Sequence, residues 1–393
     1  MFEFKNPLDF SSDINPFKSI ESVRNLSPKL NLDSFLSLGK SRESVKAANN
    51  PNPIFNSPAI FADFNGDGKT DKFWRNPTTG ETAVWLMDGT RVAEVGNLDK
   101  VDSAWNFKNA DFNNDGKTDI LWRNAQTGEN VIWLMDGTKI SSATSVLQVD
   151  ASWNNEIGDF NGDGKTDILW RNAQTGENAT WLMDGTTIST AAFLPKADGN
   201  WTQSMVDFNG DRKTDIFWRN TTTGENKVWF MDGTKENEYS LAEVDPSWSY
   251  TLGDFNGDSN TDILWRNGVT GENKVWQMNS ILVSEGTLDT LDANWKSSIG
   301  DFNGDGKTDI LWRNGVTGEN SAWLMDGTKV DTSAFMPKVD PARNLTIGDY
   351  NGDGKTDIFW RNQTTGENSI WEMNDTIPNP SDITQVPQEW TVY

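Results

Sequence analysis

The chain has 393 residues, and its 58 acidic residues outnumber its 34 Lys and Arg, which gives a formal net charge of −24. It has no Cys and no His, so disulfides, thiol nucleophiles, Ser-His-Asp triads and metal sites built on thiolate or imidazole are excluded. The acidic balance also argues against a nucleic-acid partner, because phosphate backbones are bound through clustered Lys and Arg. The combination of so much Asp with 20 Trp requires an explanation.

Residues 1–53 differ from the rest of the chain. They contain no Trp, and the opening MFEFKNPLDF lacks the basic-then-apolar pattern of a conventional secretory signal. No stretch of the chain reaches the apolar length of a transmembrane helix. We interpret residues 1–53 as an irregular N-terminal leader that is either disordered or a docking segment.

Residues 54–393 consist of one repeat written seven times. The phrase DFNGDGKTDILWRN recurs with small variations at spacings of 47 or 48 residues. Its first Asp lies at Asp63, Asp111, Asp159, Asp207, Asp254, Asp301 and Asp349. A repeat of this length is the size of one propeller blade.

The elements within each repeat follow a fixed order. In the third repeat, the Asp-rich loop leads into an apolar run at residues 168–172, a turn at 175–177, a second apolar run around 181 and a turn at 184–185. Short apolar runs bounded by Thr-Gly-Glu and Asp-Gly turns are strand and hairpin signals, and no run has sustained helical periodicity. The sequence therefore predicts an all-β fold, a seven-bladed β-propeller of four-stranded blades.

The two ends of the repeat array complement one another. Repeats two to six carry a Trp six residues before the loop Asp, whereas the first repeat has Ser57 there and the seventh has Arg343. The chain ends at residues 390–393, where an eighth repeat would begin, and Trp390 has the place of the missing Trp. We expect this C-terminal strip to return to the first blade and close the ring.

Each Asp-rich loop has the pattern D-x-N-x-D-G-x-x-D. Side-chain oxygens at positions 1, 3, 5 and 9, with a backbone carbonyl at position 7, match the start of an EF-hand-type loop, and an all-oxygen ligand set favours Ca²⁺. An ordinary surface turn uses the same residue types, but seven in-register matches favour metal. We therefore predict a calcium loop in each blade and up to seven Ca²⁺. The predicted ligands are Asp63, Asn65, Asp67, Lys69 and Asp71; Asp111, Asn113, Asp115, Lys117 and Asp119; Asp159, Asn161, Asp163, Lys165 and Asp167; Asp207, Asn209, Asp211, Lys213 and Asp215; Asp254, Asn256, Asp258, Asn260 and Asp262; Asp301, Asn303, Asp305, Lys307 and Asp309; and Asp349, Asn351, Asp353, Lys355 and Asp357.

Two loops depart from this pattern at position 6, where Arg212 and Ser259 replace Gly. Glycine tolerates the sharp turn at this position better than other residues do, so we expect these two sites to be the weaker ones.

Seven units of this length with a DxNxDGxxD loop resemble the FG-GAP/VCBS repeats. These repeats form the propeller of integrin α-subunits and of many bacterial surface proteins, and fungal lectins with calcium-loop propellers are similar. The resemblance covers residues 55–393, although Trp-Arg-Asn stands where the Gly-Ala-Pro signature would. It implies that the loop joins the first and second strands, opposite the ligand-binding face, and that sugars bind between blades.

The Trp residues fall at three places in the repeat. Fourteen lie eleven or twenty-two residues after the loop Asp, and we expect them to pack between blades. The third set lies at the end of the blade opposite the loop, where Arg and Asn of the second strand and the Thr-Gly-Glu turn also lie. An aromatic ring beside Arg, Asn and Glu suits a sugar; alternatively, Arg171 pairs with Glu177 across the hairpin. The candidate ligand-binding residues are Trp105, Arg123, Trp153, Arg171, Trp201, Arg219, Trp248, Arg266, Trp295 and Arg313.

These observations favour a non-catalytic, multivalent binding or adhesion module for carbohydrate or a surface protein. No repeat carries the distinct local residue set that an enzyme needs. The alternative is a structural component of a cell-surface layer or filament, in which self-assembly occurs. Calcium sites of this kind fill outside the cell, so we expect an extracellular or cell-surface location, with an export route that the sequence does not identify.

Overall fold

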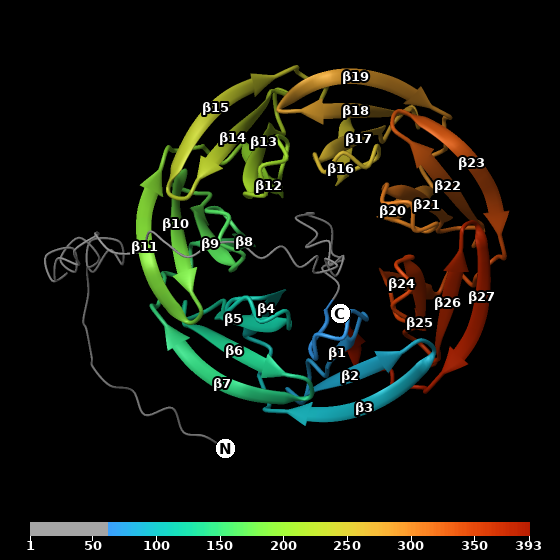
Figure 1. Ribbon diagram of the computed structural model, residues 1–393, viewed down its shortest axis with the longest axis horizontal. Coiled ribbons are helices and arrows are strands. Elements are labelled where there is room, and N and C mark those ends of the chain that lie inside the picture. Colours follow the sequence, from blue (N-terminus) through green and yellow to red (C-terminus); the bar gives the residue numbers. More distant parts are fainter. Residues whose placement is uncertain (1–61) are drawn as a thin grey trace, which may run out of the picture.

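The repeats form seven four-stranded antiparallel sheets that are arranged in a ring (Figure 1). This computed structural model describes residues 62–393, in which all regular elements are strands. The predicted all-β, seven-bladed propeller is confirmed. The leader, its boundary at residue 53 and Ser57 lie outside the described residues. Within residues 62–393, no helix is long and apolar enough to cross a membrane.

The four strands of each blade lie side by side, in order from the centre of the ring to its outer edge. The innermost strands are β28 (Thr391–Val392), β4 (Trp105–Ala110), β8 (Asn154–Gly158), β12 (Trp201–Val206), β16 (Trp248–Gly253), β20 (Trp295–Gly300) and β24 (Arg343–Gly348). The second strands are β1 (Lys72–Arg75), β5 (Asp119–Asn124), β9 (Asp167–Asn172), β13 (Asp215–Asn220), β17 (Asp262–Asn267), β21 (Asp309–Asn314) and β25 (Asp357–Asn362).

The third strands are β2 (Thr82–Asp88), β6 (Asn130–Asp136), β10 (Glu177–Asp184), β14 (Asn226–Asp232), β18 (Asn273–Asn279), β22 (Asn320–Asp326) and β26 (Asn368–Asn374). The outermost strands are β3 (Arg91–Leu98), β7 (Lys139–Val146), β11 (Thr187–Leu194), β15 (Lys235–Leu241), β19 (Ile281–Leu288), β23 (Lys329–Met336) and β27 (Ile377–Ile383).

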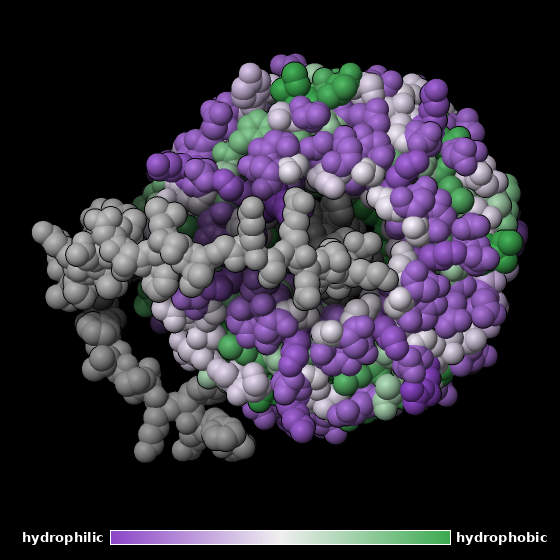
Figure 2. Space-filling view, in the orientation of Figure 1, coloured by the Kyte–Doolittle hydropathy of each residue, from purple (hydrophilic) through white to green (hydrophobic). Residues whose placement is uncertain are grey.

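Burial along these strands follows their place in the ring. The second strand is covered on both faces by neighbouring blades, so every residue of β5, DILWRN, is buried. The outermost strand has one face against the blade stack and one in solvent, so β7, KISSATSV, alternates strictly between exposed and half-buried residues. The face of the ring shown in Figure 2 is accordingly mostly hydrophilic, with hydrophobic residues in small separate groups.

The C-terminal strip closes the ring, as predicted. β28 pairs with β1 in an antiparallel register that matches Val392 with Trp74 and Thr391 with Arg75. The backbone N–H of Tyr393 donates to the carbonyl of Phe73 at 2.9 Å. Trp390 packs against the cluster that contains Trp74 and Trp85. The first blade is therefore completed by the last residues of the chain.

The seven hydrophobic clusters each span two adjacent blades. Both predicted core sets of Trp are buried in them, which confirms the packing prediction. In every blade the two core Trp rings lie 4.8–5.4 Å apart between centroids, tilted or edge to face. Large aromatic pairs fill the wedge-shaped gaps between the blades.

Adjacent Asp-rich loops are joined by hydrogen bonds around the whole ring. The N–H of Thr118 in the second loop donates to the carbonyl of Asp63 at 2.7 Å, and the N–H of Asp63 donates to the Thr118 hydroxyl at 2.8 Å. The same exchange joins Thr70 of the first loop to Asp349 of the last, at 2.6 and 3.0 Å. Each loop is therefore fixed by its neighbour, and the chain of loops is closed.

Candidate metal-binding loops and ligand-binding pockets

The Asp-rich loops lie between the innermost and second strands, as the resemblance implied. In the first loop, the Asp63 carboxylate accepts N–H bonds from Gly66, Asp67 and Gly68 at 2.7–3.2 Å, which curls the backbone around it. The Asn65 carbonyl oxygen accepts the N–H of Asp67 at 3.1 Å. The side-chain oxygens at positions 1, 3 and 5 are thus arranged within one turn of backbone.

The ninth loop position is a buried carboxylate at the start of the second strand. Asp71 accepts the N–H of Phe64 at 2.8 Å and that of Met87 at 2.9 Å. Burial raises its pKa to about 7, and the nearby Asp63 and Asp67 carboxylates add to the shift. In the fourth loop, burial raises the pKa of Asp215 to about 8. Burial therefore disfavours the charged form of both carboxylates.

The donor chemistry of the loops fits a hard cation, although carboxylates alone do not build a closed cage. Across residues 62–393, no three Asp or Glu side chains gather closely enough to hold a metal ion by themselves. An EF-hand-type loop does not rely on carboxylates alone, because Asn and backbone carbonyl oxygens complete its ligand set. The full set of oxygen donors in the loop, and not any single carboxylate, is what fits a hard cation.

Position 6 of the loop has a left-handed backbone in both departing repeats, as expected. Arg212 has φ of 66° and Ser259 has φ of 69°, close to the 81° of Gly68 at the same place. Side chains carry a steric penalty in this region, so the two loops are strained where the other five are not.

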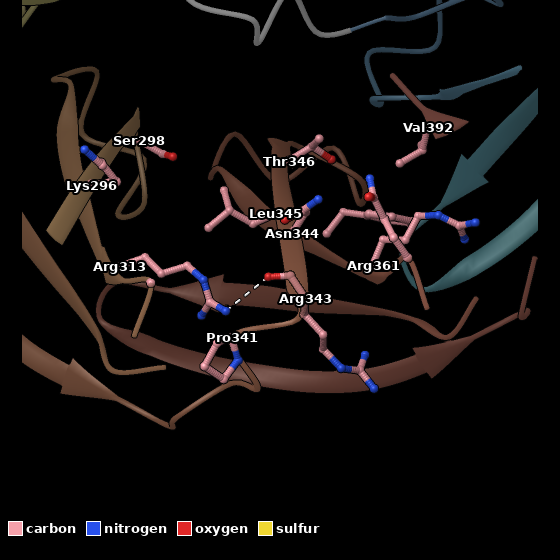
Figure 3. Close-up of a pocket in the computed structure, with 13 residues that line it drawn as sticks. Lys296, Ser298, Arg313, Pro341, Arg343, Asn344, Leu345, Thr346, Arg361 and Val392 are labelled. Atoms are coloured by element: carbon pink, nitrogen blue, oxygen red, sulfur yellow. Dashed lines mark hydrogen bonds between the residues drawn. The ribbon is translucent and has the colours of Figure 1, made fainter. Parts of the chain in front are cut away.

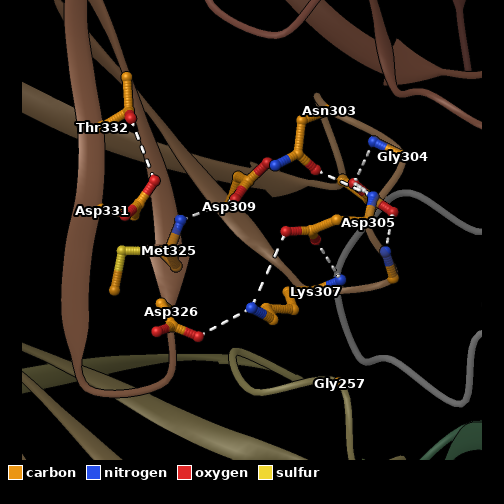
Figure 4. A network of polar contacts seen from close by, with 12 residues as sticks. Gly257, Asn303, Gly304, Asp305, Lys307, Asp309, Met325, Asp326, Asp331 and Thr332 are labelled. Carbon is orange, nitrogen blue, oxygen red and sulfur yellow. Dashed lines mark hydrogen bonds and ion pairs between the residues drawn. The ribbon is translucent and has the colours of Figure 1, made fainter.

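In the six loops with Lys at the seventh position, the Lys side chain forms a surface ion pair. In the sixth blade, Lys307 reaches Asp326 at the end of β22 at 2.7 Å, and Asp305 lies 4.0 Å away (Figure 4). Lys213 and Asp232 form the same pair at 2.7 Å. The Lys side chain therefore ties the loop to the next hairpin, and its backbone carbonyl is the group that the sequence assigned to metal.

The predicted ligand-binding Trp set lies at the end of the blades opposite the loops. Trp105, Trp201, Trp248 and Trp295 begin the innermost strands, and Trp153 directly precedes β8. Trp153 and Trp295 are buried and the other three are half-buried. The predicted position is confirmed, whereas binding of a ligand to these rings stays a prediction.

The Arg of the Trp-Arg-Asn motif joins neighbouring blades. The Arg171 guanidinium, in a side chain only 4 % exposed, donates to Asn178 Oδ1 and to the carbonyls of Ala197, Asp198 and Trp201 at 2.7–3.1 Å. It lies 4.7 Å from the ring centroid of Trp218 in the next blade.

The same Arg-over-Trp contact occurs at all seven blade junctions, at 4.6–5.2 Å. The predicted alternative, an Arg171–Glu177 pair, is wrong: Glu177 pairs with Lys196 at 3.2 Å. Arg123, Arg171 and Arg219 are buried, and Arg266 is tied to the carbonyls of Leu291 and Asp292, so their donors serve the fold. A ligand-binding role for these four stays an untested prediction.

A pocket of about 520 Å³ lies where the inner strands of the sixth and seventh blades meet (Figure 3). Lys296 and Ser298 of β20 lie on one side of it, and Asn344 and Thr346 of β24 lie at its centre. Arg313, a predicted ligand residue, lines it, and one Arg313 amino group donates to the Arg343 carbonyl at 3.1 Å. The lining is therefore rich in hydrogen-bonding side chains.

Sequence reasoning missed most of the residues of this pocket. Asn344, Thr346 and Gln363 occupy positions that vary between repeats, so the repeat pattern did not identify them. The available signal was Arg343, which replaces the strand-one Trp in this blade only. The Arg343 guanidinium forms an ion pair with Glu367 at 2.9 Å, so this blade lacks the aromatic ring that the other blades have at this position.

Comparisons with known proteins agree with this architecture. The FG-GAP-like repeat family matches residues 63–122, 111–170, 159–218, 207–265 and 301–360. A search of curated proteins found no relative. Among solved structures, a lectin of Agrocybe aegerita that recognises non-reducing terminal N-acetylglucosamine has a TM-score of 0.67 at 13 % identity, over 83 % of this chain and 95 % of the lectin.

Two enzymes also share the fold at low identity. Prolyl oligopeptidase B from Galerina marginata has a TM-score of 0.52 at 13 % identity, over 84 % of this chain and 50 % of its own. A putative 6-phosphogluconolactonase from Bacteroides uniformis has a TM-score of 0.51 at 12 % identity, over 82 % and 99 %. These likenesses concern the fold alone. By the repeats matched over most of its length, this chain belongs to the FG-GAP-like repeat family.

Proposed function

We propose that this protein is a non-catalytic, calcium-stabilised propeller that binds carbohydrate on the side of the ring opposite its Asp-rich loops. The observation that carries the proposal is the pocket between the sixth and seventh blades. Its amide, hydroxyl and cationic side chains provide both donors and acceptors, as a ligand made of hydroxyl groups requires.

The calcium part of the proposal rests on the oxygen donors of the Asp-rich loops. Oxygens of Asp63, Asn65, Asp67 and Asp71, with the carbonyl of Lys69, would hold the ion in the first blade, and equivalent residues would hold it in the others. A bound divalent cation would neutralise carboxylates whose pKa burial raises to about 7. Because adjacent loops are hydrogen-bonded to each other, ordering one loop would support the next.

Carbohydrate is the first ligand class to test because the lectin from Agrocybe aegerita shares the fold across nearly its whole length. An extracellular or cell-surface location follows from the calcium proposal, since loops with few protein ligands fill where calcium is plentiful. The non-catalytic assignment rests on the near-identity of the repeats, which nominates no distinct catalytic set.

A glycan array, run with calcium and with a chelator, tests the proposal. We expect the full chain to bind a defined set of glycans with calcium present, and Asn344→Ala to weaken that binding at least tenfold. Asn106→Ala is the matched control, because Asn106 pairs with Arg123 in β5 as Asn344 pairs with Arg361 in β25. Equal effects of the two substitutions, or calcium-dependent self-assembly without glycan binding, would contradict the proposal and favour a structural role.

A further inference from the structure

A second pocket, of about 600 Å³, lies between the fifth and sixth blades. Three aromatic residues form its walls: Trp295 of β20 and Trp323 of β22, which are 8 % and 6 % exposed, and Phe335 of β23, which is 76 % exposed. The ring centroids of Trp295 and Phe335 are 6.4 Å apart. Ser321 and Ser333 and the connection at residues 289–291 complete the lining.

In two other blades, the fourth and the fifth, this niche holds an internal cation. In the fourth blade, the Lys227 ammonium lies 4.8 Å from the ring centroid of Trp201 and 5.3 Å from that of Trp229. The Glu238 carboxylate forms an ion pair with this ammonium group at 2.8 Å and also accepts the Trp229 indole N–H at 2.7 Å. The fifth blade repeats the arrangement, with Lys274 5.1 Å from both Trp248 and Trp276 and 3.2 Å from Glu285.

The sixth blade keeps both tryptophans of this arrangement and lacks the internal cation. Strand register aligns Ser321 with Lys227, because Ser321 pairs with Trp312 as Lys227 pairs with Trp218. It aligns Ser333 with Glu238, because Ser333 pairs with Trp323 as Glu238 pairs with Trp229. Replacing Lys and Glu with two serines leaves the space between the aromatic rings open.

The electrostatics of the pocket favour a cation. Asp289 is the one ionisable side chain that lines it, and the chain carries a formal charge of −24. The faces of Trp and Phe rings attract ammonium groups, and recognition of quaternary ammonium compounds commonly uses several such rings. The rim is also held in place, since the Asn273 side chain donates to the Asp289 carbonyl at 2.7 Å and Arg266 donates to the Leu291 carbonyl at 3.1 Å.

From these observations we propose that the pocket between the fifth and sixth blades is an aromatic cage for the ammonium group of a small organic cation. The external ammonium takes the place that Lys227 and Lys274 occupy in the preceding blades. Phe335 supplies a third ring that those blades lack, because Ser240 and Thr287 face the corresponding positions of the third strand. The site is separate from the donor-rich pocket proposed for carbohydrate and independent of the calcium loops.

Choline is the probe that tests this cage, with 3,3-dimethylbutan-1-ol as a neutral compound of the same shape. In calorimetric titrations of the full chain, we expect one equivalent of choline to bind and the neutral alcohol to bind at least tenfold more weakly. Equal binding of the two compounds, or no choline binding, would overturn the proposal. Saturable binding of a methyl glycoside at this pocket without any choline binding would assign it to a neutral sugar instead.

Variants that copy the neighbouring blades provide the matched controls. Ser321→Lys with Ser333→Glu installs the internal ion pair and should abolish choline binding, whereas Lys227→Ser with Glu238→Ser should open a second, weaker site in the fourth blade. Phe335→Ala changes an exposed ring and should weaken binding at least fivefold without altering the melting temperature. Unchanged choline binding in both the Phe335 variant and the double Ser321 and Ser333 variant would place the cation elsewhere and overturn the proposal.

Discussion

At the scale of single residues, the Arg of each Trp-Arg-Asn motif directly links neighbouring blades. Its guanidinium satisfies backbone carbonyls of the connection that leads to the next blade and stacks on that blade's buried Trp. A planar group with five donors can do both, and a Lys ammonium cannot.

Arg171→Ala should therefore destabilise the ring strongly. The carbonyls of Ala197, Asp198 and Trp201 would lose a charged donor, and we expect a loss of roughly 3 kcal/mol in the free energy of unfolding, measured by urea denaturation. Arg171→Lys should recover little of this loss. Glu177→Gln is the control, since Glu177 is not a partner of Arg171; equal destabilisation by the two changes would contradict this assignment.

Backbone strain at loop position 6 leads to a second residue-level prediction. Arg212→Gly and Ser259→Gly relieve left-handed backbone at φ of 66° and 69°, so each should stabilise its loop by about 1 kcal/mol. The gain should appear as tighter calcium binding by that loop in a titration. Gly68→Ala, at φ of 81° and with open space around its Cβ, should have the opposite effect. Weaker binding after either Gly replacement would contradict the strain argument.

At the scale of elements, β28 has only two residues but completes the first blade. It supplies the innermost strand of the first blade, and its surroundings match those of the other blades: Arg361 donates to the Trp390 carbonyl at 2.8 Å as Arg171 does to that of Trp201 at 2.7 Å. Tyr393 adds edge-to-face packing on Phe107 of the second blade, 4.8 Å between centroids. The strip therefore contacts the last, first and second blades.

Deletion of residues 390–393 should lower the melting temperature by about 10 °C or more. The deletion removes one strand of the first blade and leaves the edge of β1 unpaired, so the expected loss is several kcal/mol for a ring of this size. Tyr393→Phe is the control, because it keeps the strip and should melt within a few degrees of the full chain. A deletion variant that melts like the full chain would show that the ring closes without β28.

The sequence predicted the elements well because every repeat provided an independent copy of the same pattern. The spacing of the repeats in the sequence was enough to predict the loop positions, the two core Trp sets and the closing role of Trp390. Most partners of Arg171 could not be predicted in this way, because three of the four are backbone carbonyls 26 to 30 residues further along the chain, which carry no residue-type signal. The Lys–Glu pairs of the fourth and fifth blades were visible in the sequence, but only strand register shows that they fill a niche between two tryptophans.

At the scale of the whole molecule, sevenfold repetition builds the scaffold, and the two pockets proposed as binding sites are lined by residues that vary between repeats. Core Trp pairs, Arg junctions and loop-to-loop bonds recur around the ring. The donor-rich pocket lies where Arg343 replaces a Trp, and the aromatic pocket lies where the sixth blade has serines at the positions of the Lys and Glu of the fourth and fifth blades. The unusual combination of Asp and Trp thus belongs to the repeated scaffold, and seven bound Ca²⁺ would reduce the formal charge from −24 to about −10.

We propose that calcium in the Asp-rich loops stabilises the closed ring, and thermal melting of the full chain across a calcium titration tests this most directly. If calcium binds the folded loops and not the unfolded chain, the melting temperature should rise with free calcium and fall again when a chelator is added. Asp159→Asn should reduce the number of ions bound by one. A melting temperature that is the same in calcium and in chelator would contradict the account.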